Sequence, residues 1–305
     1  MVMSSQMTKF IPNINFPPPK FKIPPVHQDD IPQFTFAELL EISRFNDIDK
    51  MDIQVGEKGG TRFLYVHNIL ENPLDLRKML MQFPAENRAQ SAKEALKLNK
   101  GTSFSTSKAP GLQQPIERQL MPAFGNELFF LIGHRLGFIK YRRESINWKY
   151  FSNCFFPGMT AWNRNYLPHM DPFSYAANIF LTDHPKACTT FFRYTDPVTG
   201  IEHYNLYDVC SQKSVENGTK ERYIKQITDR YGYLPAPEIP NGFKSPNVQA
   251  EPWEFWKGDD FYEDYLELPS CFNTMSFYAG KRWHSACYDA HNEESARYSL
   301  VAVIE

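Results

Sequence analysis

His169 and Asp171 stand two residues apart in the sequence, and both side chains can bind a metal ion. On an extended chain residues i and i+2 point to the same side, so the imidazole and the carboxylate can bind one ion. A second histidine, His284, follows the apolar stretch Phe272–Tyr278, which predicts a strand. We therefore expect His169, Asp171 and His284 to form a metal site that leaves coordination positions open for other ligands.

Arg297 and Ser299 follow the distal histidine in a segment, Ala296–Ile304, that predicts the terminal strand. The two residues share a face by the same alternation. A guanidinium group binds a carboxylate through two parallel hydrogen bonds, so this pair suits the far end of a dicarboxylic acid. The polar run Asp289–Glu294 predicts a reversal of the chain. It could bring the strand with Arg297 back beside the strand that leads to His284.

The order of these motifs (H-x-D, a long gap, a distal His, then R-x-S) resembles that of the iron(II)- and 2-oxoglutarate-dependent oxygenases, and most of all the prolyl 4-hydroxylase-like members. The similarity spans residues 61–305. It implies a double-stranded β-helix, a distorted jelly roll, with N-terminal helices. It also implies that Fe(II), 2-oxoglutarate and O2 are used, and that 2-oxoglutarate is anchored on Arg297 and Ser299. An amino-acid, peptidyl or small-molecule substrate would be hydroxylated, with release of succinate and CO2.

The strand expected after the H-x-D motif departs from the prolyl hydroxylases, in which a Tyr or Thr there usually touches 2-oxoglutarate. Inward alternation here selects Ala176, Asn178 and Phe180, so Asn178 is the residue we expect to hydrogen-bond the cosubstrate. Asn163 shares strand alternation with His169 and is a further candidate. An asparagine at a strand edge that bonds to the backbone is the more ordinary interpretation of Asn163.

Three alternatives stay open. His291 is the rival of His284 as the distal ligand, but it lies in a polar run typical of a turn, close to Arg297. A cupin-like metal protein without oxygenase activity, or a zinc hydrolase, would not need the Arg297-x-Ser299 motif. A non-catalytic barrel used for binding would not need intact metal ligands.

The predicted elements change in kind near residue 137. Before it we expect a strand at 61–66 and helices from Pro73, at 86–99 and at 115–136. Beyond it we expect short strands and a helix at 219–231. The predicted strands are 148–156, 158–166, 175–182, 188–194, 203–209, 271–278 and 296–304. The pattern predicts a mainly β fold with flanking helices, of the α+β class.

The domain organisation follows from the distribution of proline. Residues 1–33 are rich in proline and predict an extended tail. Residues 34–305 predict a single domain, which the resemblance makes an oxygenase domain. Within it, residues 211–269 predict an insertion or lid before the last two core strands.

Composition limits the possible partners and location. A formal net charge of −2 gives no reason to expect nucleic acid as a partner. Five cysteines without a C-x-x-C pair favour a reducing compartment, and no apolar run is long enough to cross a bilayer. We expect a cytoplasmic protein with no membrane association. The sequence does not predict the oligomeric state.

Overall fold

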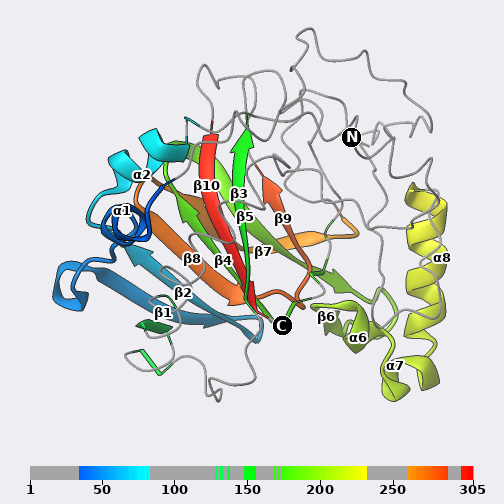
Figure 1. The fold of residues 1–305 in the computed structure, drawn as a ribbon. Coiled ribbons are helices and arrows are strands. Elements are labelled where there is room, and N and C mark those ends of the chain that lie inside the picture. Colours follow the sequence, from blue (N-terminus) through cyan, green and yellow to red (C-terminus); the bar gives the residue numbers. More distant parts are fainter. Residues whose placement is uncertain are drawn as a thin grey trace, which may run out of the picture.

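The computed structural model describes residues 34–80, 82, 128, 131–132, 136–137, 148–155, 168, 170–171, 173–231, 260–287 and 297–304. Within these residues the fold is mainly β with some helices (Figure 1). The strands form two antiparallel sheets, and neither closes into a barrel. The predicted β-rich α+β class is confirmed at this level.

The larger sheet has six strands in the order β1-β2-β8-β4-β10-β3. Their bounds are β1 (Asp52–Lys58), β2 (Thr61–His67), β8 (Thr274–Ala279), β4 (Tyr175–Phe180), β10 (Arg297–Ile304) and β3 (Trp148–Phe155). The predicted strands 61–66, 148–156, 175–182, 271–278 and 296–304 correspond to β2, β3, β4, β8 and β10. β10 pairs with β4 and β3, so the prediction that it returns beside the strand leading to His284 is wrong, because β4 separates β10 from β8.

The smaller sheet has the order β6-β5-β7, and β9 also pairs with β5. Its strands are β5 (His184–Thr195), β6 (Glu202–His203), β7 (Glu263–Ser270) and β9 (His284–Cys287). The predicted strand 188–194 corresponds to part of β5. Two tyrosine hydroxyl groups join β7 to β2 of the larger sheet: Tyr265 bonds the Thr61 hydroxyl at 2.6 Å, and Tyr65 donates to the Pro269 carbonyl oxygen at 2.8 Å.

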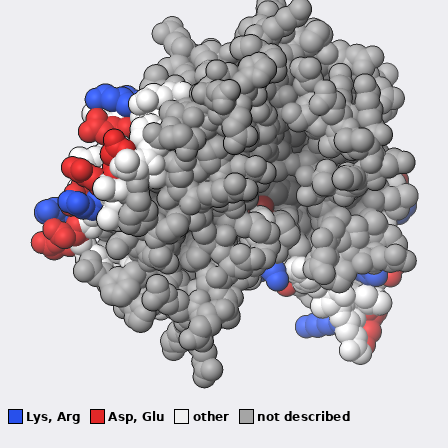
Figure 2. Space-filling model, viewed as in Figure 1, with Lys and Arg blue, Asp and Glu red and all other residues white. Residues whose placement is uncertain are grey.

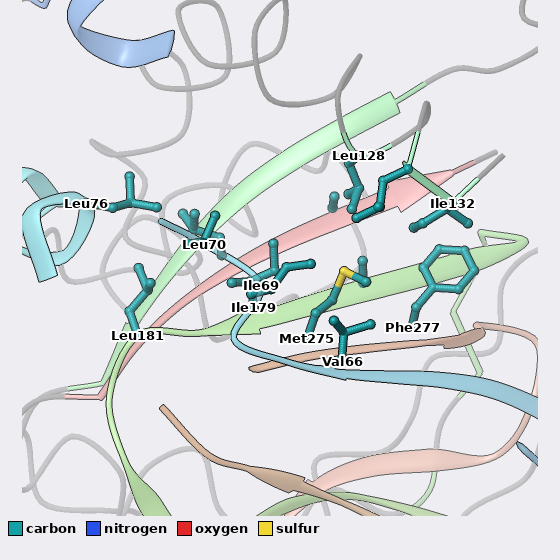
Figure 3. Packing of buried hydrophobic residues seen from close by; sticks show 14 of the residues in the cluster. Val66, Ile69, Leu70, Leu76, Leu128, Ile132, Ile179, Leu181, Met275 and Phe277 are labelled. Atoms are coloured by element: carbon teal, nitrogen blue, oxygen red, sulfur yellow. The ribbon is translucent and has the colours of Figure 1, made fainter. Parts of the chain in front are cut away.

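Alternation along the strands gives the larger sheet two different faces. The outer face carries Ile179, Phe277 and Leu300, which pack with apolar residues of two N-terminal helices, α1 (Phe36–Ile42) and α2 (Pro73–Leu80) (Figure 3). The opposite face carries Ala176, Tyr278 and Val303, which pack with Phe191 and Leu268 of the smaller sheet. This second face is called the inner face below.

The start of α1 is fixed by a capping box. Thr35 accepts a hydrogen bond from the backbone N–H of Glu38, and the Glu38 carboxylate accepts one from the backbone N–H of Thr35 at 2.7 Å. Two backbone donors that a helix start leaves open are thus satisfied. The helix predicted from Pro73 is confirmed as α2, with Leu76, Met79 and Leu80 buried.

Three further helices, α6 (Leu206–Val209), α7 (Gln212–Glu216) and α8 (Thr219–Tyr231), follow β6. Tyr223 and Ile227 of α8 pack with Phe192 and Tyr194 of β5, on the side of the smaller sheet away from the inner face. The buried carboxylate of Asp196 holds the start of α8 through Arg222 and Thr219. The predicted helix at 219–231 is confirmed.

Two predicted segments differ from the structure. The strand predicted at 203–209 is wrong, because only Glu202–His203 pairs and Asn205 then caps α6, accepting a hydrogen bond from the Asp208 N–H at 2.8 Å. Residues 263–269, predicted within an insertion, lie in β7, which pairs with β5 along most of its length. The other predicted elements, at 1–33, 86–99, most of 115–136 and 158–166, lie outside the described residues.

The surface of the described residues carries charges of both signs. Where described residues are visible in Figure 2, mainly at the left edge and the lower right, Lys and Arg side chains lie beside Asp and Glu side chains. In the described part of the chain, no helix combines the length and apolar character needed to cross a bilayer.

Candidate metal centre

His284 opens β9 and is almost completely buried, with 4% of its surface exposed. Its pairing partner across the strands is Phe191 of β5, whose side chain belongs to the inner face. The Nδ1 atom lies 2.8 Å from the carbonyl oxygen of Arg282. A carbonyl oxygen can only accept, so Nδ1 is the donor, and in the neutral ring the lone pair stands on Nε2. The backbone thus fixes the tautomer that a metal ligand needs.

Asp171 is held against the turn that follows β8. Its backbone N–H donates to the carbonyl oxygen of Gly280 at 2.8 Å, and the Gly280 N–H donates to the carbonyl oxygen of Ser174 at 3.0 Å. The Asp171 Oδ2 atom lies 3.4 Å from Nε2 of His284, and the Asp171 side chain is 22% exposed. Two residues far apart in the sequence therefore bring an imidazole nitrogen and a carboxylate oxygen to one point.

The electrostatics of this pair favour a positive charge between the two side chains. Burial lowers the pKa of His284, but the charge and hydrogen bond of Asp171 and the Arg282 carbonyl raise it more, so the net pKa lies above its ordinary value. Nε2 thus takes up a proton readily beside the carboxylate. A metal cation at the same point would supply the positive charge without a proton.

The geometry of the pair also fits a shared metal ion. A distance of 3.4 Å is longer than the span of about 2.7–2.9 Å in a strong ion-paired hydrogen bond. Two ligand atoms, each about 2.1 Å from one ion and at an angle between a right angle and a tetrahedral one, lie roughly 3.0–3.4 Å apart. Imidazole nitrogen with carboxylate oxygen is a donor set that suits divalent iron as well as zinc.

The third predicted ligand, His169, lies outside the described residues. Its neighbours on either side are described: Pro168 is buried, and the Met170 sulfur accepts a hydrogen bond from the Leu206 N–H at 3.2 Å. Within the described residues there is no group of three His, Cys, Asp or Glu side chains that could hold a metal ion. The structure therefore brings Asp171 and His284 together, and the part of His169 stays a prediction.

Tyr278 is a site residue that the sequence analysis missed. Its ring packs edge-on against His284 at 5.2 Å and against Phe191 at 5.0 Å between centroids. Burial raises the pKa of its hydroxyl, and the Asp171 charge raises it further, while hydrogen bonds to Asn178 and Thr189 lower it in part. The net pKa lies above the ordinary value. Tyr278 was hidden in the sequence because the last residue of an apolar strand is normally a core residue.

Asn178 lies on the inner face, as its alternation predicted. Its direct neighbours across the strands are Ser276 of β8 and Val301 of β10. The Asn178 amide nitrogen donates to the Tyr278 hydroxyl at 2.9 Å. Contact between Asn178 and a cosubstrate stays a prediction.

Ser299 and Arg297 lie on β10 at the odd-numbered positions. The even-numbered residues of the strand, Leu300 and Ala302, belong to the outer core. Ser299 is buried and pairs with Phe180 and Asn153. Val301 and Val303 belong to the inner cluster, and Arg297 has the same parity along the strand. The backbone at Arg297 pairs with β3, and its side chain is outside the described part of the structure. Asn163 and His291 also lie outside the described residues.

Comparison with known proteins assigns no family. No protein-family model matches the sequence, and no curated protein matches it either. A function is therefore argued from the geometry of the centre and from the motifs around it.

Proposed function

We propose that this chain is an iron(II)- and 2-oxoglutarate-dependent oxygenase that hydroxylates an amino-acid, peptidyl or other small substrate. The observation that carries the proposal is the pairing of the buried His284 Nε2 atom with the Asp171 carboxylate at 3.4 Å. His169 would complete a facial set of two histidines and one carboxylate, because it stands two residues before Asp171. When bound, iron and 2-oxoglutarate together would supply the oxidation of a C–H bond by dioxygen.

The succession of strands supports a double-stranded β-helix. Strand β4 belongs to the larger sheet, β5 and β7 to the smaller, β8 to the larger, β9 to the smaller and β10 to the larger. A chain that crosses repeatedly between two antiparallel sheets in this way is wound as a jelly roll is.

The residues of the chain have separable tasks. His284 and Asp171 would hold the metal, and the Arg282 carbonyl would keep the imidazole in the required tautomer. Arg297 and Ser299 would bind the far carboxylate of 2-oxoglutarate, which requires Arg297 to direct its side chain along the inner face. The apolar inner cluster, which includes Phe191 and Leu268, would exclude water from the reacting groups.

The register of the strands fixes how far the backbone of Arg297 stands from the residues beside His284. Val303 pairs with Ala176, which pairs with Tyr278 beside His284. Arg297 stands six residues earlier on β10, which is about 20 Å of strand. The backbone of Arg297 therefore lies toward the end of β10 that is opposite the row of Tyr278. Extended 2-oxoglutarate is much shorter than this length of strand, so the proposal requires the Arg297 side chain and the metal ligands to reach toward each other along the sheet.

The proposal is tested by the release of succinate from 2-oxoglutarate. We expect the full chain with Fe(II) and oxygen to form succinate slowly without a primary substrate and faster with a substrate from a panel of amino acids and peptides. Asp171→Ala should abolish the release. The matched control Asp75→Ala removes an exposed carboxylate that pairs with Lys78 on α2, and it should not change the release of succinate.

Two outcomes would overturn the proposal. Tight metal binding without any affinity for 2-oxoglutarate would favour a cupin-like metal protein or a zinc hydrolase. Failure to bind a divalent metal would favour a non-catalytic barrel used for binding.

A further inference from the structure

Residues 204–208, which link β6 to α6 and form the first part of that helix, contact the stretch of chain that carries Asp171. The Leu206 N–H donates to the sulfur of Met170 at 3.2 Å, and Met170 directly precedes Asp171. Met170 is partly buried and packs against the apolar cluster that includes Leu206 and Trp283. A thioether sulfur is a weak acceptor, so this contact orients the chain at Met170 more than it stabilises it.

The same 204–208 segment contacts the stretch of chain that carries His284. The Trp283 N–H donates to the carbonyl oxygen of Tyr204 at 3.0 Å. The guanidinium carbon of Arg282 lies 5.8 Å from the centre of the Tyr204 ring. The Arg282 carbonyl oxygen in turn accepts the hydrogen bond from His284 Nδ1 at 2.8 Å. Both stretches of chain that form the proposed metal centre therefore rest on one short segment.

Asp208 joins these contacts through a single carboxylate oxygen. Its Oδ2 atom accepts a hydrogen bond from the Tyr204 N–H at 3.2 Å and lies 3.5 Å from Nη1 of Arg282. The other terminal nitrogen of Arg282, Nη2, donates to the carbonyl oxygen of Gly60 at 3.0 Å, in the turn between β1 and β2. The guanidinium group is thus held from two sides, and with it the residue whose backbone orients His284.

The Asp208–Arg282 pair is placed to fix geometry rather than to add stability. The side chain of Asp208 is 41% exposed and that of Arg282 is 23% exposed. Ion pairs that solvent reaches to this extent contribute little to folding. Their atoms nevertheless restrict where the residues bonded to them can lie.

We propose that Asp208 is a positioning residue of the metal centre: its carboxylate holds the 204–208 segment and Arg282 together, and so fixes the separation of the two metal-bearing stretches. This inference rests on the proposed function, because it concerns the same ligands. Asp171 and His284 are far apart in the sequence, so their spacing of 3.4 Å depends on tertiary contacts of this kind. Groups that bind a metal must be held within about 0.5 Å of the productive geometry. Asp208 acts through Arg282 and the backbone, and takes no part in binding the ion itself.

The test is titration of the full chain with Co(II), followed by visible absorption. Co(II) accepts imidazole and carboxylate ligands, and the positions of its absorption bands depend on how the ligands are arranged. Asp208→Ala should shift the bands and raise the Kd for Co(II) about three- to tenfold, which is less than the loss of about 10- to 100-fold typical of a group bonded directly to a ligand. Its melting temperature should stay close to that of the wild type, because the ion pair is partly exposed.

Two further variants separate positioning from other effects. Asp208→Asn keeps an oxygen that can accept both N–H groups, so its Kd and its bands should match those of the wild type. Glu71→Ala is the matched control, because it removes a partly exposed carboxylate that pairs with an arginine, Arg44, at 3.7 Å in another part of the fold. It should leave the Kd and the bands unchanged.

Four results would overturn the inference and leave the proposed function standing. Unchanged Co(II) binding and bands in Asp208→Ala would show that the contact does not position the ligands. Equal losses in Asp208→Asn and Asp208→Ala would assign the effect to the charge of the carboxylate. A loss of the same size in Glu71→Ala would make the effect unspecific. A large fall in the melting temperature of Asp208→Ala would make the pair structural. Failure of the wild type to bind Co(II) would instead overturn the proposed function itself.

Discussion

Gly280 is the residue at which a single added methyl group should damage the proposed metal centre most selectively. A Cβ atom at this position would lie 2.8 Å from the carbonyl oxygen of Phe173, 3.1 Å from the Asp171 Cβ atom and 3.5 Å from Asp171 Oδ2. The first contact is with backbone, so it cannot be relieved by a rotamer change. The Asp171 N–H is also bonded to the Gly280 carbonyl oxygen, so any shift of Gly280 moves Asp171 with it.

The expected magnitudes follow from these contacts. Overpacking of this kind costs about 1–3 kcal/mol of stability. Displacement of groups that orient a ligand typically lowers metal affinity about 10- to 100-fold. We therefore expect Gly280→Ala to fold, to melt at a lower temperature and to bind Mn(II) at least about tenfold more weakly than the wild type.

The assay is calorimetric titration with Mn(II), well below the melting temperature of each variant. Gly200→Ala is the control, because Gly200 has a φ of +68° with open space around it. Its side chain would cost about 1–2 kcal/mol through backbone strain, without any contact with Asp171. Gly200→Ala should lose comparable stability and keep its metal affinity. If Gly280→Ala binds Mn(II) as tightly as Gly200→Ala does, the reasoning that Gly280 positions Asp171 is wrong.

Three further predictions concern the ligands, the cosubstrate and the stability of the fold. His284→Ala should lower Mn(II) affinity by more than about tenfold in the same calorimetric assay, and unchanged affinity would exclude His284 as a ligand. Arg297→Ala should raise the KM for 2-oxoglutarate by at least about tenfold in the succinate assay, because a charged hydrogen bond is lost, and an unchanged KM would refute its role. Burial raises the pKa of Asp196, but hydrogen bonds from Arg222 and Thr219 lower it more, so the net pKa lies well below the ordinary value. A carboxyl group whose pKa is lowered by folding stabilises the folded state at pH values above its unfolded pKa of about 3.9. This stabilisation is lost as the pH falls through the lower pKa of the folded state. In urea unfolding at pH 7, Asp196→Asn should therefore have a free energy of unfolding about 1–3 kcal/mol lower than that of the wild type. This difference in free energy should become smaller below about pH 4. A difference that does not change with pH would contradict the prediction.

Two strands that line the inner face, β4 and β10, were predictable from local patterns, whereas β9, which begins at His284, was not predicted as a strand. Alternation placed Asn178 and Ser299 on one face, and the register of β4 with β10 agrees with that parity. The capping box of Thr35 and Glu38 was also present in the sequence, so α1 could have been predicted from T-x-x-E before an apolar run.

Other features depend on tertiary contacts that no local pattern encodes. β7 could not be predicted because its segment follows a long proline-rich stretch, and its place is decided by pairing with β5. Tyr278 and Gly280 acquire their roles only when β8 ends beside Asp171. The neighbours of β10 were predicted wrongly, because the order of strands in a sheet depends on long-range pairing rather than on the turn that precedes a strand.

The most direct measurement of the central claim is an anaerobic titration of the Fe(II)-loaded chain with 2-oxoglutarate, followed by visible absorption. If His284 and Asp171 hold iron with positions open to a chelating 2-oxo acid, a weak charge-transfer band should grow and saturate as 2-oxoglutarate is added. The same titration of Asp171→Ala should give no band. A wild-type chain that binds Fe(II) and shows no band at saturating 2-oxoglutarate would contradict the account.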